Sequence, residues 1–160
     1  MSIPRHRYSL SLPRSPSVAP AMMQFVNPVL TNTMSLAQLM FDAYQGTIDS
    51  EDETLEEAID AVEQYFQDNP LETHSAVLME EGVCIAACLV SYLEKQNAPL
   101  IAYIMTRRES KQTGLARLLL GDVLQKLEAA GYERVLAAIT EGNEPSEKLF
   151  ASYGFERMGK

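Results

Sequence analysis

Hydrophobic side chains recur at two different spacings along this chain, and the change of spacing strongly constrains the fold. Across residues 33–66 they fall at helical spacing, whereas residues 75–106 hold short apolar runs rich in β-branched residues and broken by turns. Helical spacing returns at residues 112–130, and another apolar strand follows at residues 134–140. A chain of 160 residues with this order is expected to form one domain, with helices packed against a mostly antiparallel sheet.

Several residues mark where these elements begin and end. Thr54 and Glu57 form a capping-box pattern before the second helix, and Asn69-Pro70 ends that helix. Gly131 can adopt a positive φ and is expected to close the third helix. The expected helices are residues 33–44, 54–68, 112–130 and 146–152, and the expected strands are residues 75–79, 83–93, 99–106 and 134–140.

The first thirty residues are rich in Ser, Pro and Arg and contain no Asp or Glu. Such a segment is typical of a disordered extension, a misassigned start before Met22, Met23 or Met34, or an organelle transit peptide. Within it, residues 7–12 alternate between polar and apolar, which predicts a first strand. We therefore distinguish an N-terminal extension, residues 1–30, from a domain at residues 31–160, and expect the extension to be dispensable for cofactor binding.

Composition excludes several classes of protein. A net charge of −9 argues against a nucleic-acid binder, and no apolar run approaches the ~20 residues of a membrane span. Cys84 and Cys88 lie within one apolar run, match no metal or redox motif and are expected in the core, which fits a reducing cytoplasm. His6 and His74 are far apart in sequence and accompany no cysteine cluster, so no metal site is expected.

A polar loop at residues 107–112 joins an expected strand to an expected helix with Gly114-Leu115-Ala116 in its first turn. The N–H groups of a first helical turn lack intrahelical partners and can bind a diphosphate, and Gly114 and Ala116 would leave room for it. The same pattern is equally typical of an ordinary helix start that contains a glycine and binds no anion. Positive charge nearby comes from Arg107, Arg108, Lys111 and Arg117.

A second segment, residues 143–155, follows the last expected strand, and with the loop it resembles the GNAT acetyltransferases. The first motif of that family is a basic residue or Gln, two other residues, Gly, one other residue, and Gly or Ala. The matching residues here are Lys111, Gln112, Thr113, Gly114, Leu115 and Ala116. The later signature matches Asn143, Ser146, Leu149, Phe150, Gly154 and Phe155. The resemblance covers roughly residues 33–155.

The resemblance implies an α/β fold with a twisted, mixed, mostly antiparallel sheet flanked by helices, in which strands 99–106 and 134–140 splay apart. It also implies acetyl-CoA as co-substrate, with pantetheine in the resulting cleft. Pantetheine would pair with the backbone of Ile104, Met105 and Thr106, and pyrophosphate would lie at Lys111, Gln112, Thr113, Gly114, Leu115 and Ala116. Asn143 and Ser146 would face the pantetheine, and Phe150 would pack near the thioester.

The chemistry that the resemblance implies is direct attack of a neutral amine on the thioester, with a backbone N–H near Met105 stabilising the oxyanion. Many members carry a Tyr that protonates the leaving thiolate where this chain has Phe150. Tyr153 lies three residues later, on the same side of a helix, and is a candidate replacement or a core residue beside Phe155.

A carboxylate base that some members carry maps near Leu100, which is apolar. Glu141 or Glu94 could act through a water instead, or each could be a solvated loop acid. The chain also stops five residues after Phe155, where the family normally continues into further strands. The resemblance therefore does not indicate which residues form the acceptor pocket.

Two functions follow. The first is an N-acetyltransferase acting on an amine of a small molecule or peptide, as a cytoplasmic monomer or homodimer. The second is a GNAT-like module that binds acetyl-CoA without turnover, as a sensor. From Ser15 to Glu94 there are fourteen acids and no Lys or Arg. This acidic half is either a solvated face or the wall of a pocket for a cationic acceptor.

Overall fold

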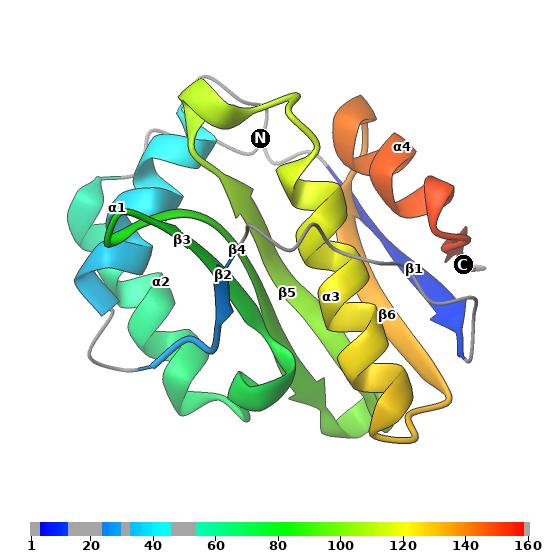
Figure 1. Cartoon of the computed structure of the whole chain (residues 1–160). Helices are drawn as coiled ribbons and strands as arrows, with labels where there is room; N and C mark the ends of the chain where they lie inside the picture. Colours follow the sequence, from blue (N-terminus) through cyan, green and yellow to red (C-terminus); the bar gives the residue numbers. More distant parts are fainter. Residues whose placement is uncertain (1–3, 13–23, 30–32, 46–53, 159–160) are drawn as a thin grey trace.

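A computed structural model describes residues 4–12, 24–29, 33–45 and 54–158. These residues form one seven-stranded sheet in the order β2-β3-β4-β5-β6-β1-β7, flanked by four helices (Figure 1). The strands are β1 (Arg5–Ser11), β2 (Gln24–Val26), β3 (Ala76–Glu80), β4 (Val83–Leu93), β5 (Ala98–Thr106), β6 (Arg134–Thr140) and β7 (Glu156–Arg157). The helices are α1 (Thr33–Tyr44), α2 (Leu55–Gln67), α3 (Leu115–Ala129) and α4 (Glu144–Ser152). The predicted α/β fold with a mixed, mostly antiparallel sheet is confirmed.

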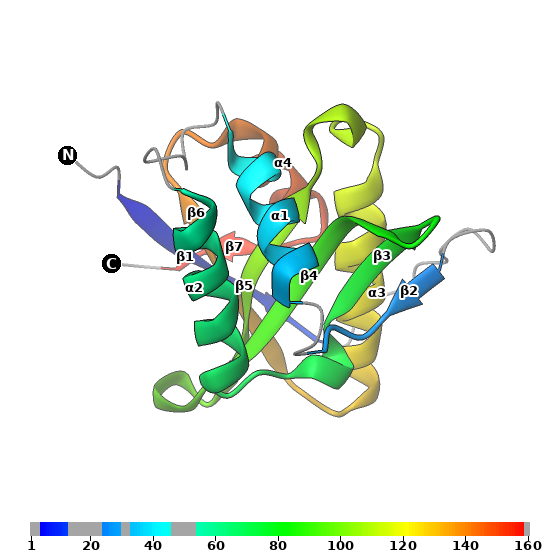
Figure 2. The ribbon, with the colours of Figure 1, turned by 90° about the vertical axis from the view of Figure 1, so that its left-hand side faces the viewer.

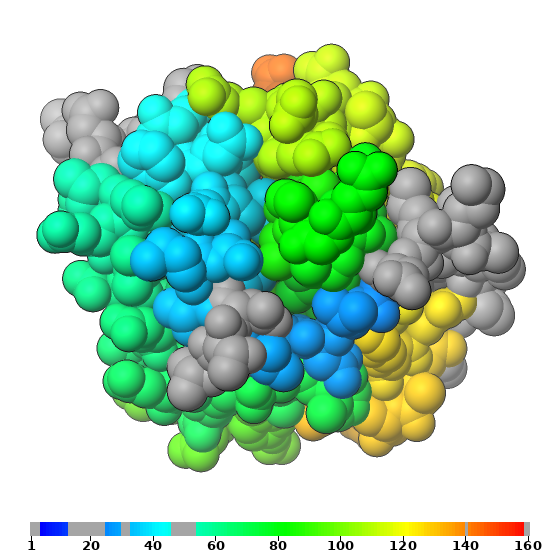
Figure 3. Space-filling model, turned by 60° about the vertical axis from the view of Figure 1, so that its left-hand side comes forward, coloured from blue at the N-terminus to red at the C-terminus, as the bar shows by residue number. Residues whose placement is uncertain are grey.

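The helices divide between the two faces of the sheet. Helices α1 and α2 pack on one face, and α3 and α4 on the other (Figure 2). Strand β4 serves both layers because alternate side chains point to opposite faces, so Leu89 packs under α1 and α2 while Cys88 packs under α3. In Figure 3, α1 lies between α2 and the β3–β4 hairpin on the outer surface of its layer.

The helix boundaries follow the expected signals, except that α4 begins at Glu144 rather than at residue 146 and that α3 begins later than predicted. The Thr54 hydroxyl accepts a hydrogen bond from the Glu57 N–H at 3.2 Å, and the Thr54 N–H donates to the Glu57 carboxylate at 3.0 Å, so the capping box is confirmed. Helix α3 begins at Leu115 rather than at residue 112, because Gly114 is its N-cap and has a φ of 87°. Gly131 has a φ of 90° just beyond the helix, as predicted.

The first thirty residues contribute two of the seven strands. Strand β1 pairs along its whole length with β6, from Arg5 opposite Thr140 to Ser11 opposite Arg134, and its other edge pairs with β7. Leu10 and Leu12 are buried in the core. Strand β2 pairs with β3. Strands β2 and β7 are too short to show a hydrophobic period, which explains why the sequence did not predict them.

Strands β5 and β6 are the parallel pair, and their backbones pair only near the beginning of each strand. The pairing is limited to Leu100 opposite Leu136 and Ile101 opposite Ala137. On its other edge β5 changes register with β4, because Ala102 is an extra residue between the positions opposite Leu89 and Val90. Such a bulge bends a strand, and here it lies where β5 leaves β6. The predicted splay is confirmed.

No helix in the described ranges is long and apolar enough to cross a membrane. Cys84 and Cys88 are buried free thiols, as expected, and burial raises the pKa of both. Within the described part of the chain, no three His, Cys, Asp or Glu side chains gather as a metal site would require.

Candidate active site

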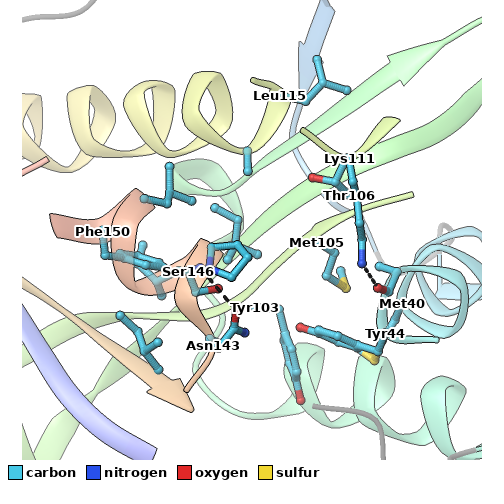
Figure 4. Close-up of a pocket in the computed structure, with 18 of the residues that line it drawn as sticks. Met40, Tyr44, Tyr103, Met105, Thr106, Lys111, Leu115, Asn143, Ser146 and Phe150 are labelled. Carbon is cyan, nitrogen blue, oxygen red and sulfur yellow. Dashed lines mark hydrogen bonds between the residues drawn. The ribbon is translucent and has the colours of Figure 1, made fainter. Parts of the chain in front are cut away.

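A cleft of about 700 Å³ opens where β5 and β6 part. Its walls come from α1, α2, β5, the loop before α3, the first turn of α3 and the β6–α4 segment. In Figure 4, Ser146 and Phe150 of α4 lie on one side, Met40 and Tyr44 of α1 on the other, and Tyr103 and Met105 of β5 between them. The predicted cofactor residues that line this cleft are Ile104, Met105, Thr106, Lys111, Gln112, Gly114, Leu115, Ala116, Asn143, Ser146 and Phe150.

The start of α3 supplies backbone donors to the cleft. Gly114 has no side chain to cap the helix, so the first N–H groups of α3 have no side-chain acceptor there. A Cβ built on Gly114 would meet nothing within 4 Å, so the space predicted at this position exists. Glycine is needed chiefly for its φ of 87°, which other residues rarely adopt. Thr113 is not a lining residue, and its hydroxyl donates to the Ser110 carbonyl.

The polar loop before α3 is attached to the end of α1. The Arg108 backbone N–H donates to the Asp42 carboxylate at 2.8 Å, and the Arg108 Nε lies 3.2 Å from the other carboxylate oxygen. The Lys111 ammonium donates to the Ala43 carbonyl at 2.5 Å, in the last turn of α1. Cations are favourable at a helix C-terminus, so α1 holds the loop that leads into α3.

Asn143 organises the other wall of the cleft. Its side-chain oxygen accepts a hydrogen bond from the Ser146 N–H at 3.3 Å and so caps α4. Phe150, in the same helix, is only 3% exposed, and its ring meets that of Phe155 edge to face at 5.0 Å between centroids. Phe150 therefore lines the cleft from a fixed position in the core.

The two residues predicted for proton transfer do not line the cleft. The Tyr153 hydroxyl donates to the Arg117 carbonyl at 2.7 Å, and the Arg117 guanidinium lies 5.0 Å from the centre of the Tyr153 ring. Glu141 lies 3.0 Å from the His6 imidazole, and its N–H donates to the Pro4 carbonyl. Both side chains are thus engaged with other elements.

The cleft also contains polar residues that the sequence did not single out as lining it: Arg5, Tyr44, Gln45, Tyr103 and Ser110. Glu57, from the acidic half predicted to form the wall of a pocket for a cationic acceptor, lines it too. Burial raises the pKa of the Tyr103 phenol, and the nearby positive charge of Arg5 acts in the opposite direction. Tyr103 could have been found from the alternation along β5, because it lies two residues before Met105. Arg5 could not, because the composition of residues 1–30 placed it in an extension.

Several solved structures share this fold, although a comparison with curated proteins finds no match. A GCN5-related N-acetyltransferase from Sphaerobacter thermophilus is 16% identical with a TM-score of 0.74, over 96% of this chain and 48% of the other. This chain therefore spans about half the length of that relative. The ribosomal-protein-S18-alanine N-acetyltransferase from Escherichia coli is 15% identical with a TM-score of 0.70, over 86% and 80% of the two chains. An aminoglycoside N-acetyltransferase in complex with CoA is 18% identical with a TM-score of 0.64, over 93% and 94%.

At these identities the likeness establishes the fold. The family follows from the sequence itself, because the model of the acetyltransferase (GNAT) family matches residues 34–155, which is most of the chain. That match includes α2 to α4, all of α1 except Thr33, and the whole lining of the cleft except Arg5. This protein belongs to the acetyltransferase (GNAT) family.

Proposed function

We propose that this protein transfers the acetyl group of acetyl-CoA to an amine of a small molecule or peptide. The observation that carries the proposal is that two kinds of backbone donor open into one cleft. The first N–H groups of α3 lie at one end, and the edge of β5 beyond Ile101, where β6 no longer pairs with it, lies along the middle. The N–H groups of α3 suit an anion, and the free edge of β5 suits an extended chain of amides.

Acetyl-CoA would supply the thioester that the amine attacks. The residues that would hold it are Lys111 to Ala116 at the pyrophosphate, Ile104 to Thr106 and Asn143 and Ser146 along pantetheine, and Phe150 near the thioester. The open space beside Gly114 fits a bound anion, because no protein atom occupies it. A backbone N–H near Met105 would stabilise charge on the carbonyl oxygen during transfer.

Tyr103 is the residue that we propose to act on the acceptor. Tyr103 lines the cleft, and its phenol is protonated at neutral pH, since burial raises a pKa that is ordinarily near 10. It can therefore both donate and accept a hydrogen bond and so orient the acceptor nitrogen. Tyr153 as proton donor and Glu141 as base remain predictions, and the Tyr153→Phe variant described below distinguishes Tyr153 from Tyr103.

The acceptor is proposed to present an ammonium group to the acidic side of the cleft, and a nitrogen that attacks the thioester must first lose its proton to a base or to solvent. Of the acids on the described part of α2, Glu57 lines the cleft, whereas Glu56, Asp60 and Glu63 do not. Asp49, Glu51, Asp52 and Glu53 lie outside the described residues. If acidic charge attracts the acceptor, added salt will raise the KM for the acceptor more than the KM for acetyl-CoA. The relatives named for aminoglycosides and for a ribosomal-protein alanine support an amine acceptor.

A thiol-release assay tests the proposal. The protein is incubated with acetyl-CoA and a panel of amines, and free CoA is measured with a thiol reagent while mass spectrometry identifies the acetylated product. The protein's own thiols add little signal, because Cys84 and Cys88 are 7% and 0% exposed. Amine-dependent release is expected. Saturable binding of acetyl-CoA without release for any amine would instead indicate the non-catalytic module.

A further inference from the structure

Strand β1 brings Arg5 to the cleft from the beginning of the chain. Arg5 is opposite Thr140, at the end of β6. Side chains alternate along a strand, and Tyr8 and Leu10 pack into the core beneath α3. Arg5 and Arg7 therefore point to the other face, on which α1 and α2 lie. Arg5 lines the cleft there, together with Glu57 and Ala61 of α2 and Tyr103 of β5.

Arg5 differs from the other charged side chains that line the cleft. The Lys111 ammonium is bound to the Ala43 carbonyl, and the Arg117 guanidinium to the Ser152 hydroxyl at 2.6 Å. One carboxylate oxygen of Glu57 is bound within the capping box. Among the residues that the structure describes, the Arg5 guanidinium has no hydrogen bond and no ion pair. A guanidinium presents a planar set of donors that matches carboxylate and phosphate oxygens.

Its position separates Arg5 from the proposed pyrophosphate site. The N-terminus of α3 belongs to the layer on the opposite face of the sheet, whereas Arg5 lies on the face of α1 and α2. Its charge also reaches Tyr103, where it opposes the effect of burial on the pKa of the phenol. Arg5 thus lies on the same face of the sheet as the residue that we propose to orient the acceptor, and its charge acts on that residue.

We propose that Arg5 binds an anionic group of the acceptor, a carboxylate or a phosphate, so that the enzyme selects amines that also carry such a group. This inference rests on the proposed function, because it names the substrate class of the same cleft. Glu57 and Arg5 line one cleft, and together they suit a molecule with an ammonium group and an anion. The substrate selected is then zwitterionic rather than a polyamine.

Equilibrium binding to the CoA-loaded protein tests the inference without any turnover. Matched pairs share an amine and differ in the anion: lysine and cadaverine, phenylalanine and phenethylamine, and phosphoethanolamine and ethanolamine. The first two pairs report on a carboxylate and the third on a phosphate. The wild-type protein is expected to bind the anionic member of at least one pair about tenfold more tightly. A larger preference is not expected, because Arg5 is exposed and solvent weakens its interaction with an anion.

The variant Arg5→Ala is expected to lose that preference, and Arg5→Lys to retain part of it. Arg7→Ala is the matched control, because Arg7 lies on the same strand and face but does not line the cleft. No preference in the wild-type protein, or an unchanged preference in Arg5→Ala, would overturn the inference. Failure of every amine to release CoA in the thiol assay would instead count against the proposed function. The binding preferences could still be measured in that case, because the binding experiment requires no turnover.

Discussion

Asp42 binds Arg108 at two points, with one carboxylate oxygen 2.8 Å from the backbone nitrogen and the other 3.2 Å from Nε. Asp42 belongs to α1 and Arg108 to the loop that leads into α3, so this pair connects the acceptor-side helix to the proposed pyrophosphate site. The side chains are 39% and 61% exposed, so the pair matters more for the position of the loop than for the stability of the fold.

The variant Asp42→Ala is expected to weaken acetyl-CoA binding about fivefold. Loss of the pair removes about 1 kcal/mol of the free energy that holds the loop in its binding conformation. Calorimetric titration of acetyl-CoA measures the change, and thermal unfolding of the free protein should shift by only a few degrees. Asp68→Ala, at the C-cap of α2 and outside the cleft lining, is the control and should leave the affinity unchanged. Equal affinities in all three proteins would show that this pair does not organise the site.

Gly114 is expected to be necessary for binding the co-substrate. Gly114→Glu places a carboxylate beside the first turn of α3, where it repels an anion, and saturating acetyl-CoA should no longer stabilise the protein. A ligand at 100 times its Kd normally adds about 2.7 kcal/mol. Gly131→Glu is the matched control, because Gly131 also has a positive φ and open space around it but lies at the far end of α3. Stabilisation of a folded Gly114→Glu protein equal to that of the control would exclude this binding position.

Tyr103 and Tyr153 are expected to respond differently to loss of the hydroxyl. Tyr103→Phe should lower kcat by about 10²-fold, because Tyr103 lines the cleft and positions the acceptor. Tyr153→Phe should change kcat little, because its hydroxyl is bound to the Arg117 carbonyl outside the lining. Steady-state kinetics with one acceptor tests both variants. The reverse order of effects would identify Tyr153 as the proton donor that the sequence predicted.

Stability is expected to fall at alkaline pH, with Tyr65 as one cause. Burial raises the pKa of its phenol from 10.0 to about 12, against the opposing effect of its hydrogen bond to Ser75. Between these values the unfolded chain releases a proton that the folded protein retains, so the free energy of unfolding decreases as pH rises. The loss is about 3 kcal/mol across that interval. Chemical denaturation from pH 8 to 12 measures it, and Tyr65→Phe should show a shallower decline than the wild-type protein.

Strand β1 is expected to be necessary for stability. Leu10 is 7% exposed, and a Cβ on Gly154 would lie 3.2 Å from its Cδ1 atom, so the strand packs closely against the end of α4. Leu10→Ala should lower the free energy of unfolding by about 3 kcal/mol. Ser11→Ala, at an exposed position of the same strand, should change it by less than about 0.5 kcal/mol. Equal stability of the two variants would show that the Leu10 side chain does not stabilise the core.

The sequence by itself determined the elements whose patterns are local. The stripe of α1, the capping box at Thr54 and Glu57, and the stop at Asn69-Pro70 depend on neighbours within one or two turns, and all of them are found in the structure. The cofactor motif is similarly local, because a strand, a loop and a helix start are contiguous in the chain. Its residues therefore came together in the cleft largely as predicted.

Tertiary structure decided what lies across the cleft from that motif. Arg5 meets β6 more than 130 positions further along the chain, and Tyr44 and Glu57 come from two helices that no spacing rule connects to β5. Tyr153 stands at the spacing expected of a replacement acid, but its hydroxyl is bound to the Arg117 carbonyl outside the cleft lining. Spacing along one helix predicts a shared side, whereas the packing of that helix against its neighbours decides which cavity, if any, that side meets.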